Sequence, residues 1–210
     1  MVSLKTIAER CGVSTATVSK ALNDHKDISE ETKNRVKQTA QTLGYFPNAA
    51  ARALKTNRSY NIGVLFEEEA GRGLTHEYFS GVLNGLKIQA EKLRYDITFI
   101  NTCFENRKMS YYEHCRYRNF EGVVIVCANF DDPDVTELMN SEIPVVTIDY
   151  VHHNCTAVTS NNIQGMEDLV KYIYSQGHRK IAYIHGQEGS SVTRDRLASF
   201  YRTIDELGLE

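Results

Sequence analysis

The chain has 210 residues, of which 41% are hydrophobic and 24% charged, values that are ordinary for a globular protein and exclude a disordered or membrane-embedded chain. No apolar run is long enough to span a bilayer, and Met1 leads directly into a helical pattern, so we expect neither a membrane anchor nor a signal peptide. Five cysteines without a C-x-x-C pair favour reduced thiols and a cytoplasmic location over a disulfide framework.

The net charge of -3 conceals an asymmetry along the chain. Residues 1–58 carry ten Lys and Arg against five Asp and Glu, whereas residues 59–210 carry fourteen against twenty-two. A basic first part on an acidic remainder predicts that the first part binds a polyanion such as DNA.

Residues 4–22 have the pattern of two short helices joined by a tight turn. The first helix carries one apolar stripe, and Gly12 permits the turn that follows it. Ser14 stands where it can cap a second helix, which turns Val18, Ala21 and Leu22 inward. Two helices on a glycine turn are typical of a helix-turn-helix, whose second helix fits the major groove of DNA. The alternative is an ordinary helical hairpin within a core.

A third helix is predicted to begin after Ser29, an N-cap followed by two acidic residues, and to end at Gly44. Pro47 then ends the regular structure, and Asn48 can cap a short helix over residues 49–54. A helix of this length is unstable by itself, so we expect the segment to become ordered only when something holds it.

From residue 61 the chain alternates between strands and helices. Strands are predicted at 62–66, 97–100, 123–127, 145–148, 157–160 and 181–184, and helices at 77–93, 109–118, 131–141, 163–175 and 194–207. The apolar side chains of the helix at 77–93 are Phe79, Val82, Leu83, Leu86, Ala90 and Leu93. The alternation predicts an α/β body with a doubly wound parallel sheet, which binds ligands at the carboxyl ends of its strands, behind an all-α head.

The stretches GVSTATVSKALN, ISEETKNRV, LGYFPNAAARALKTN and NIGVL resemble the lactose-repressor and galactose-repressor family of bacterial transcription regulators. The resemblance implies a repressor that binds a palindromic operator as a dimer or higher homo-oligomer, controlled by a small-molecule effector such as a sugar. It implies a helix-turn-helix head at 1–45, a hinge at 46–58, a first lobe of a periplasmic-binding-protein-like domain at 59–161 and an incomplete second lobe at 162–210. Because family members continue further, we expect a fragment of a longer regulator that binds its effector weakly, a natural short form being the alternative.

For DNA, the resemblance makes Thr15 and Ala16 the pair that reads base edges, and it makes Leu54 a wedge inserted into the minor groove. The alternative for Leu54 is packing on its own body. We expect a change of Lys20 to weaken binding to all sequences. The complete expected DNA-binding set is Thr6, Ser14, Thr15, Ala16, Thr17, Ser19, Lys20, Asn23, Tyr45, Asn48, Arg52 and Leu54.

For the effector, six side chains are expected: Tyr78, Phe79, Asp149, Ser190, Ser191 and Arg196. Core packing is the alternative for Phe79, and Asp149 suits either polar ligand contacts or an ion pair. The planar guanidinium of Arg196 suits a carboxylate or sugar hydroxyls. The family motif has a glycine where Ser199 stands, a departure that leaves Arg196 unaffected.

No enzyme, cofactor or metal ion is expected, since neither paired carboxylates nor a Ser/His/Asp set stands out. His152, His153 and Cys155 suggest a metal site, but adjacent histidines on an extended segment point to opposite faces. Gly71-Arg72-Gly73 lacks the third glycine of a dinucleotide loop, and residues 186–191 lack the lysine of a phosphate-binding loop. The remaining alternative function is a ligand sensor of the periplasmic-binding-protein type that does not bind DNA.

Overall fold

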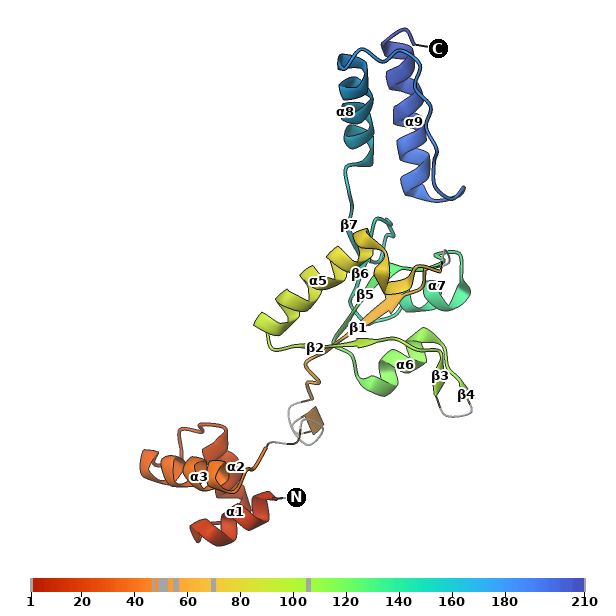
Figure 1. The fold of residues 1–210 in the computed structure, drawn as a ribbon. Helices are drawn as coiled ribbons and strands as arrows, with labels where there is room; N and C mark the ends of the chain where they lie inside the picture. The colour runs from red at the N-terminus through yellow and green to blue at the C-terminus, as the bar shows by residue number, and fades with distance from the viewer. Residues whose placement is uncertain are drawn as a thin grey trace. The chain divides into compact units, whose positions relative to one another are not determined.

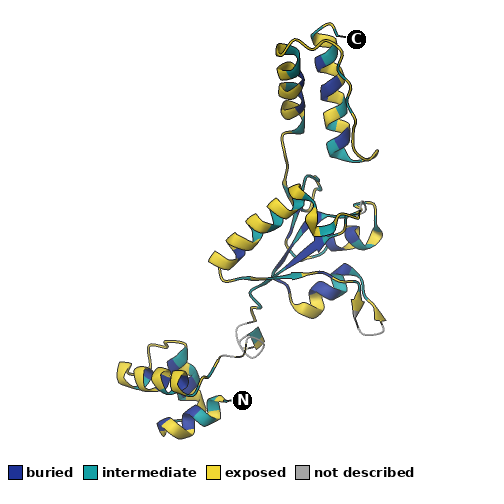
Figure 2. Cartoon of the chain, in the orientation of Figure 1, coloured by how far each residue is buried: buried dark blue, intermediate teal, exposed yellow. Residues whose placement is uncertain are grey.

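The structure is a computed structural model that describes residues 2–46, 48, 53–54, 57–68, 71–104 and 107–209. The chain divides into two compact units, Met1–Ser59 and Tyr60–Glu210. Each unit has buried apolar residues of its own, drawn dark blue in Figure 2.

The first unit, called the head below, contains three helices: α1 (Leu4–Cys11), α2 (Thr15–Leu22) and α3 (Glu30–Thr42). Each begins after a serine N-cap whose hydroxyl accepts a backbone hydrogen bond, at Ser3, Ser14 and Ser29. Gly12 closes α1 with a left-handed backbone (φ 63°) that turns the chain into α2. The caps predicted at Ser14 and Ser29 are confirmed, and the cap at Ser3 adds a third.

The core of the head is small. Ile7, Val18 and Val36, one from each helix, are fully buried at its centre. Ala8, Cys11, Ala21 and Ala40 are buried around them, and half-buried apolar side chains such as Leu22 and Ile28 pack against this cluster. Among the described residues of the head, these three are the large aliphatic side chains that are fully buried, so each of them carries a large share of its stability.

The second unit is built on a parallel sheet in the order β2-β1-β5-β6-β7. Its strands are β1 (Asn61–Phe66), β2 (Asp96–Phe99), β5 (Gly122–Cys127), β6 (Val145–Ile148) and β7 (Thr156–Val158). All neighbouring pairs in this sheet are parallel. The strand order runs from β1 to β2 on one side and to β5 on the other, which is the switch of direction that defines a doubly wound sheet. The predicted fold class is therefore confirmed.

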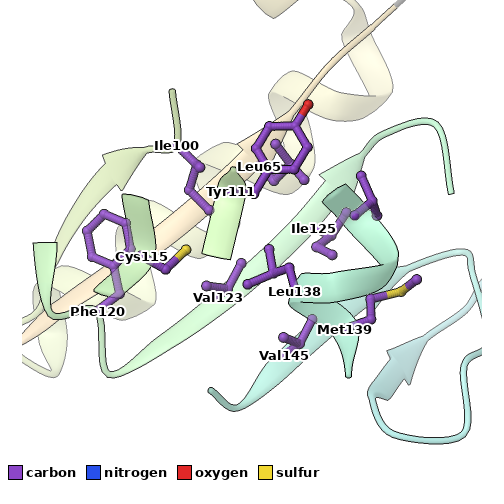
Figure 3. Close-up of a cluster of buried hydrophobic side chains, with 11 residues drawn as sticks. Leu65, Ile100, Tyr111, Cys115, Phe120, Val123, Ile125, Leu138, Met139 and Val145 are labelled. Carbon is purple, nitrogen blue, oxygen red and sulfur yellow. The ribbon is translucent and has the colours of Figure 1, made fainter. Parts of the chain in front are cut away.

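Helices cover both faces of this sheet (Figure 1). α6 (Tyr111–Arg118) and α7 (Pro133–Met139) lie on one face, and α5 (Glu77–Lys92) lies on the other. The core between the sheet and α6 and α7 consists of Leu65, Ile100, Tyr111, Cys115, Phe120, Val123, Ile125, Val135, Leu138, Met139 and Val145 (Figure 3). Because side chains alternate along a strand, Val64 and Val126 are buried on the α5 face.

Gly63 of β1 is required by the close approach of an aromatic ring. A Cβ at this position would lie 2.7 Å from Cδ2 of Phe120 and 3.1 Å from Cδ1 of Ile100. Only a glycine lets both side chains pack directly on the backbone of β1.

α8 (Asn162–Ser175) and α9 (Ser191–Glu206) lie side by side and share a small core of Met166, Val170 and Phe200 (Figure 1). The strand predicted between them at 181–184 is wrong. No neighbouring strand in the described part of the chain offers it a hydrogen-bond ladder, and Ile184 is 96% exposed.

Other differences from the predicted elements are local. Leu93 is the C-cap of α5 and is 68% exposed, so its predicted place on the apolar face is wrong, because the helix ends at Lys92. A 3₁₀ turn, η1 (Gly73–Thr75), and an antiparallel hairpin of β3 (Cys103–Phe104) and β4 (Arg107–Lys108) were not predicted. Pro47 and most of the predicted helix at 49–54 lie outside the described residues. Within the described ranges, none of the helices combines the length and apolar content that crossing a bilayer requires.

Candidate DNA-binding surface and effector site

The first turn of α2 presents a small, uncharged surface. The hydroxyl of Ser14 accepts the backbone N–H of Thr17 at 3.0 Å and lies 2.9 Å from the Thr17 hydroxyl, so these two side chains are bonded to each other. Thr15 and Ala16 are exposed beside them. They occupy the N-terminal end of the helix, which is the part that approaches base edges in helix-turn-helix proteins.

The last turn of α2 carries polar groups that are already engaged within the head. Nζ of Lys20 lies 2.5 Å from Oδ2 of Asp27, in the connection between α2 and α3. Nδ2 of Asn23 donates to the backbone carbonyl of Ser19 at 2.6 Å. Two of the expected DNA contacts therefore have partners inside the protein. Asp27 was not predicted, and its only signal in the sequence is an acidic residue shortly after the helix that carries Lys20.

The other expected DNA-binding residues are spread over the head. Thr6 is half-buried, with its hydroxyl 3.1 Å from the hydroxyl of Ser3. Tyr45 packs against the core of the head. Asn48 is exposed, and Leu54 is 88% exposed. Arg52 lies outside the described residues.

In the second unit, Asp149 is the centre of a hydrogen-bond network that follows β6. Its carboxylate accepts the hydroxyl of Tyr78 at 2.5 Å and the backbone N–H of Ser160 at 2.6 Å, and its carbonyl accepts the hydroxyl of Ser191 at 3.2 Å. Burial, followed by the hydrogen bond to the Asp149 carboxylate, raises the pKa of Tyr78 above its ordinary value. The structure thus brings together three of the six expected effector residues.

Arg196 is held on the first turn of α8. Its Nε donates to Oδ1 of Asn162 at 2.8 Å. One turn further along α9, the buried hydroxyl of Ser199 donates to the carbonyl of Ile163 at 2.7 Å. These two bonds join α9 to the first turn of α8. Ser190 is the N-cap residue of α9, but its side chain makes no cap bond.

Phe79 belongs to an aromatic cluster after β1. Its ring centroid lies 4.8 Å from that of His76, 5.3 Å from that of Tyr78 and 5.4 Å from that of Phe66. Phe79 is half-buried, so it packs in this cluster while keeping an exposed edge.

A second aromatic pair follows β5 and β6. Phe130 and Tyr150 stack at 3.7 Å with an interplanar angle of 2°. Neither was predicted. Both residues lie in the loops after the carboxyl ends of buried strands, and that position in a parallel sheet is the signal that points to them.

Two cavities lie along the segment that leads into α8. The first, of about 520 Å³, is lined by Asp131, Asp149, Tyr150, Val151, Thr159, Ser160, Asn162, Gly189, Ser191, Val192, Arg194 and Asp195. The second, of about 410 Å³, is lined by Ser160, Asn161, Asn162, Gly165, Met166, Leu169, Tyr183 and Arg196. Tyr78, Phe79 and Ser190 line neither of these cavities. Of the expected effector residues, Asp149 and Ser191 line the first cavity and Arg196 lines the second.

The rings of His152 and His153 lie side by side, with centroids 4.3 Å apart. The expectation that they point to opposite faces is wrong, because the chain turns at His153 and Asn154 and does not continue as an extended strand. Nδ1 of His152 accepts the backbone N–H of Asn154. Among the residues that the structure describes, no three His, Cys, Asp or Glu side chains gather where a metal ion could be held.

Comparison with known families agrees with both units. Residues 3–48 match the model of bacterial regulatory proteins of the lacI family. Residues 59–210 match the model of periplasmic binding proteins and the sugar binding domain of the LacI family. The chain belongs to the lacI family. The predicted family is therefore confirmed, and membership in a family of regulatory proteins agrees with the expectation that the chain is not an enzyme.

The relatives of this lacI-family chain include repressors and sugar-bound regulators. It is 27% identical to the HTH-type transcriptional repressor PurR of Aliivibrio salmonicida and 28% identical to that of Photobacterium profundum. Each match covers 100% of this chain and 62% of the relative, so the chain spans less than two thirds of their length.

Solved structures of the family have the same fold. The crystal structure of the lac repressor dimer bound to operator and the anti-inducer ONPF has a TM-score of 0.79 at 22% identity. The complex of the transcriptional regulator CelR with cellobiose has a TM-score of 0.57, also at 22% identity. Each match covers 100% of this chain and 63% of the other. The architecture is thus a helix-turn-helix head with a periplasmic-binding-protein-like body.

Proposed function

We propose that the protein is a transcriptional repressor that binds a palindromic operator as a dimer. The observation that supports this most strongly is the exposed first turn of α2, where Thr15 and Ala16 lie at the capped N-terminus of the second helix of a basic head. One short recognition helix covers too few base pairs for useful specificity, so two heads on two half-sites are required. The protein then acts where the chromosome is, in the cytoplasm.

The small molecule that controls it is a sugar. Asp149, Ser191 and Arg196 supply a carboxylate, a hydroxyl and a guanidinium, which are the groups that bind ligand hydroxyls. The matched family model, which describes a sugar binding domain, supports the same choice. The lobes predicted at 59–161 and 162–210 would enclose it.

The test of operator binding has two steps. A binding sequence is selected from random duplex DNA, and the protein is then footprinted on that selected sequence. Two symmetric protected half-sites are expected, and Ala16→Gln should change the selected bases because its amide can pair with an adenine edge. A single half-site bound with the same affinity would contradict the dimer. A periplasmic-binding-protein-type sensor that does not bind DNA would select no sequence at any salt concentration.

Leu54 gives a separate test of the hinge. A leucine that is 88% exposed is available to enter a widened minor groove and unstack a base step. Leu54→Ala should therefore reduce operator bending and specific affinity while leaving binding to random DNA nearly unchanged. If the variant bends its operator as strongly as the wild type, the wedge role is wrong.

The sugar can be sought with NMR spectra of the 1–210 protein at millimolar concentrations of mono- and disaccharides, with nucleobases as the comparison. At least one sugar should shift the Nε–H signal of Arg196, and Asp149→Ala should reduce the shift. A nucleobase that causes a saturable shift when no sugar does would contradict a sugar effector.

A further inference from the structure

The electrostatics of the recognition helix are set by an acidic residue outside it. Lys20 is the one Lys or Arg of α2, and it follows Ala16 by one helical turn on the exposed side. A cation at this place would contact a DNA phosphate if it were free. Instead, its Nζ lies 2.5 Å from the carboxylate of Asp27.

Asp27 is ionised and pairs with Lys20 at the surface. The hydrogen bond from Lys20 is the main cause that lowers the pKa of Asp27 below its ordinary value. The side chains of Lys20 and Asp27 are 47% and 53% exposed, so water and salt screen the pair and DNA can compete for it.

The same connection between α2 and α3 provides a matched comparison. Asp24, three residues before Asp27, pairs with Lys37 of α3. Both carboxylates are surface ion-pair partners of a lysine, and both have a lowered pKa whose first cause is that lysine. They differ in the helix whose lysine they pair with: Asp27 pairs with Lys20 of α2, and Asp24 pairs with Lys37 of α3.

We propose that Asp27 attenuates the sequence-independent part of DNA binding by competing with DNA phosphates for Lys20. The inference rests on the proposed DNA-binding function. Phosphate contacts carry no sequence information, so holding Lys20 lowers the affinity for every duplex while leaving discrimination to Thr15 and Ala16. A regulator that must leave its operator gains from a weak background affinity.

The size of the effect follows from counterion release. A phosphate contact contributes a slope of about −0.9 to a plot of log affinity against log salt, which corresponds to about eight-fold in affinity at 0.1 M salt. Release of Lys20 should therefore raise the affinity for random DNA by up to about eight-fold for each head. For the same reason, Lys20→Met should change the wild-type protein less than it changes a protein that lacks Asp27.

The experiment measures binding of a random-sequence duplex and of the selected operator by fluorescence anisotropy across a salt series. Asp27→Asn should tighten binding to both duplexes and steepen the salt dependence, with an unchanged ratio of the two affinities. Asp24→Asn, which adds the same charge, should have a smaller effect. In the Lys20→Met background, Asp27→Asn should lose most of its effect. Circular dichroism establishes that each variant is folded.

Equal effects of Asp27→Asn and Asp24→Asn would overturn the proposal, since a general change of charge would then explain both. An effect of Asp27→Asn that persists in the Lys20→Met background would overturn it as well. A wild-type protein that binds no duplex even at low salt would contradict the proposed function itself, and that result is distinct from the other two.

Discussion

Truncation of Ile7 tests whether the head depends on its three large buried side chains. Ile7 is fully buried at the centre of the cluster that the three helices of the head share. Ile7→Val removes one methylene and should cost about 0.5–1.5 kcal/mol of unfolding free energy, whereas Ile7→Ala should cost about 2–5 kcal/mol. A unit with so small a core has a total stability of about 3–5 kcal/mol. We therefore expect Ile7→Val to leave the head folded and Ile7→Ala to leave much of it unfolded.

The measurement is a urea titration followed by NMR, in which head and body amides report separately. Ile7→Ala should lower the midpoint of the head signals and abolish DNA binding, while the body signals remain unchanged, because the two units have separate cores. The matched control is Leu65→Ala, at a position that is 1% exposed in the body core and should give the opposite pattern. If Ile7→Ala changed the stability of the head by less than about 0.5 kcal/mol, the reasoning from burial would be refuted.

Three further predictions concern the body. Ser199→Ala removes a hydrogen bond to α8 and should cost about 1 kcal/mol of unfolding free energy, measured as faster hydrogen exchange in the first turn of α8. The control is Thr203→Val: the Thr203 hydroxyl bonds within α9, so this variant should leave the first turn of α8 protected. Burial, and secondarily a nearby arginine, lower the pKa of His114 below its ordinary 6.5, so the unfolded chain binds more protons below that pH. The unfolding free energy in urea should fall as pH decreases from 6.5 through the folded-state pKa, and less steeply in His114→Gln. Gly63→Ala should cost about 1–3 kcal/mol in thermal melting through overpacking, whereas Gly81→Ala, in open space on α5, should not destabilise.

The contradicting outcomes are equally specific. Equal protection of α8 in the two variants of α9 would mean that the Ser199 bond does not hold the helices together. The same pH dependence in His114→Gln and wild type would assign the loss of stability to carboxylates. A Gly63→Ala protein with an unchanged melting temperature would show that the neighbouring aromatic ring moves aside without cost.

The parts of the fold that the sequence predicts correctly have local causes. Ser14 and Ser29 cap helices because their hydroxyls reach amides within the same turn. The apolar runs that become β5 and β6 have no solvated face, so they identify buried parallel strands. The segment at 181–184 has an equally suitable pattern but forms no strand, because a strand also needs a partner that its own residues do not specify.

The candidate site is harder to predict because it depends on contacts between distant residues. Tyr78 and Asp149 are 71 residues apart in the chain and meet only after the sheet has formed. In the sequence, Asp27 cannot be distinguished from other acidic surface residues, because its contact with Lys20 forms only in the folded head. The sequence identifies Tyr78, Asp149 and Arg196 as candidates, but it does not show that Tyr78 bonds to Asp149. It also does not single out Asn162, the partner of Arg196.

The central claim is that the head reads DNA sequence, and the most direct test is the ratio of two dissociation constants. The selected operator and a scrambled duplex of the same length and composition are titrated with the 1–210 protein at one physiological salt concentration. A sequence-reading dimer should prefer the operator by at least about 10³-fold. Equal affinities for the two duplexes would mean that Thr15 and Ala16 read no bases and that the head binds DNA by charge alone.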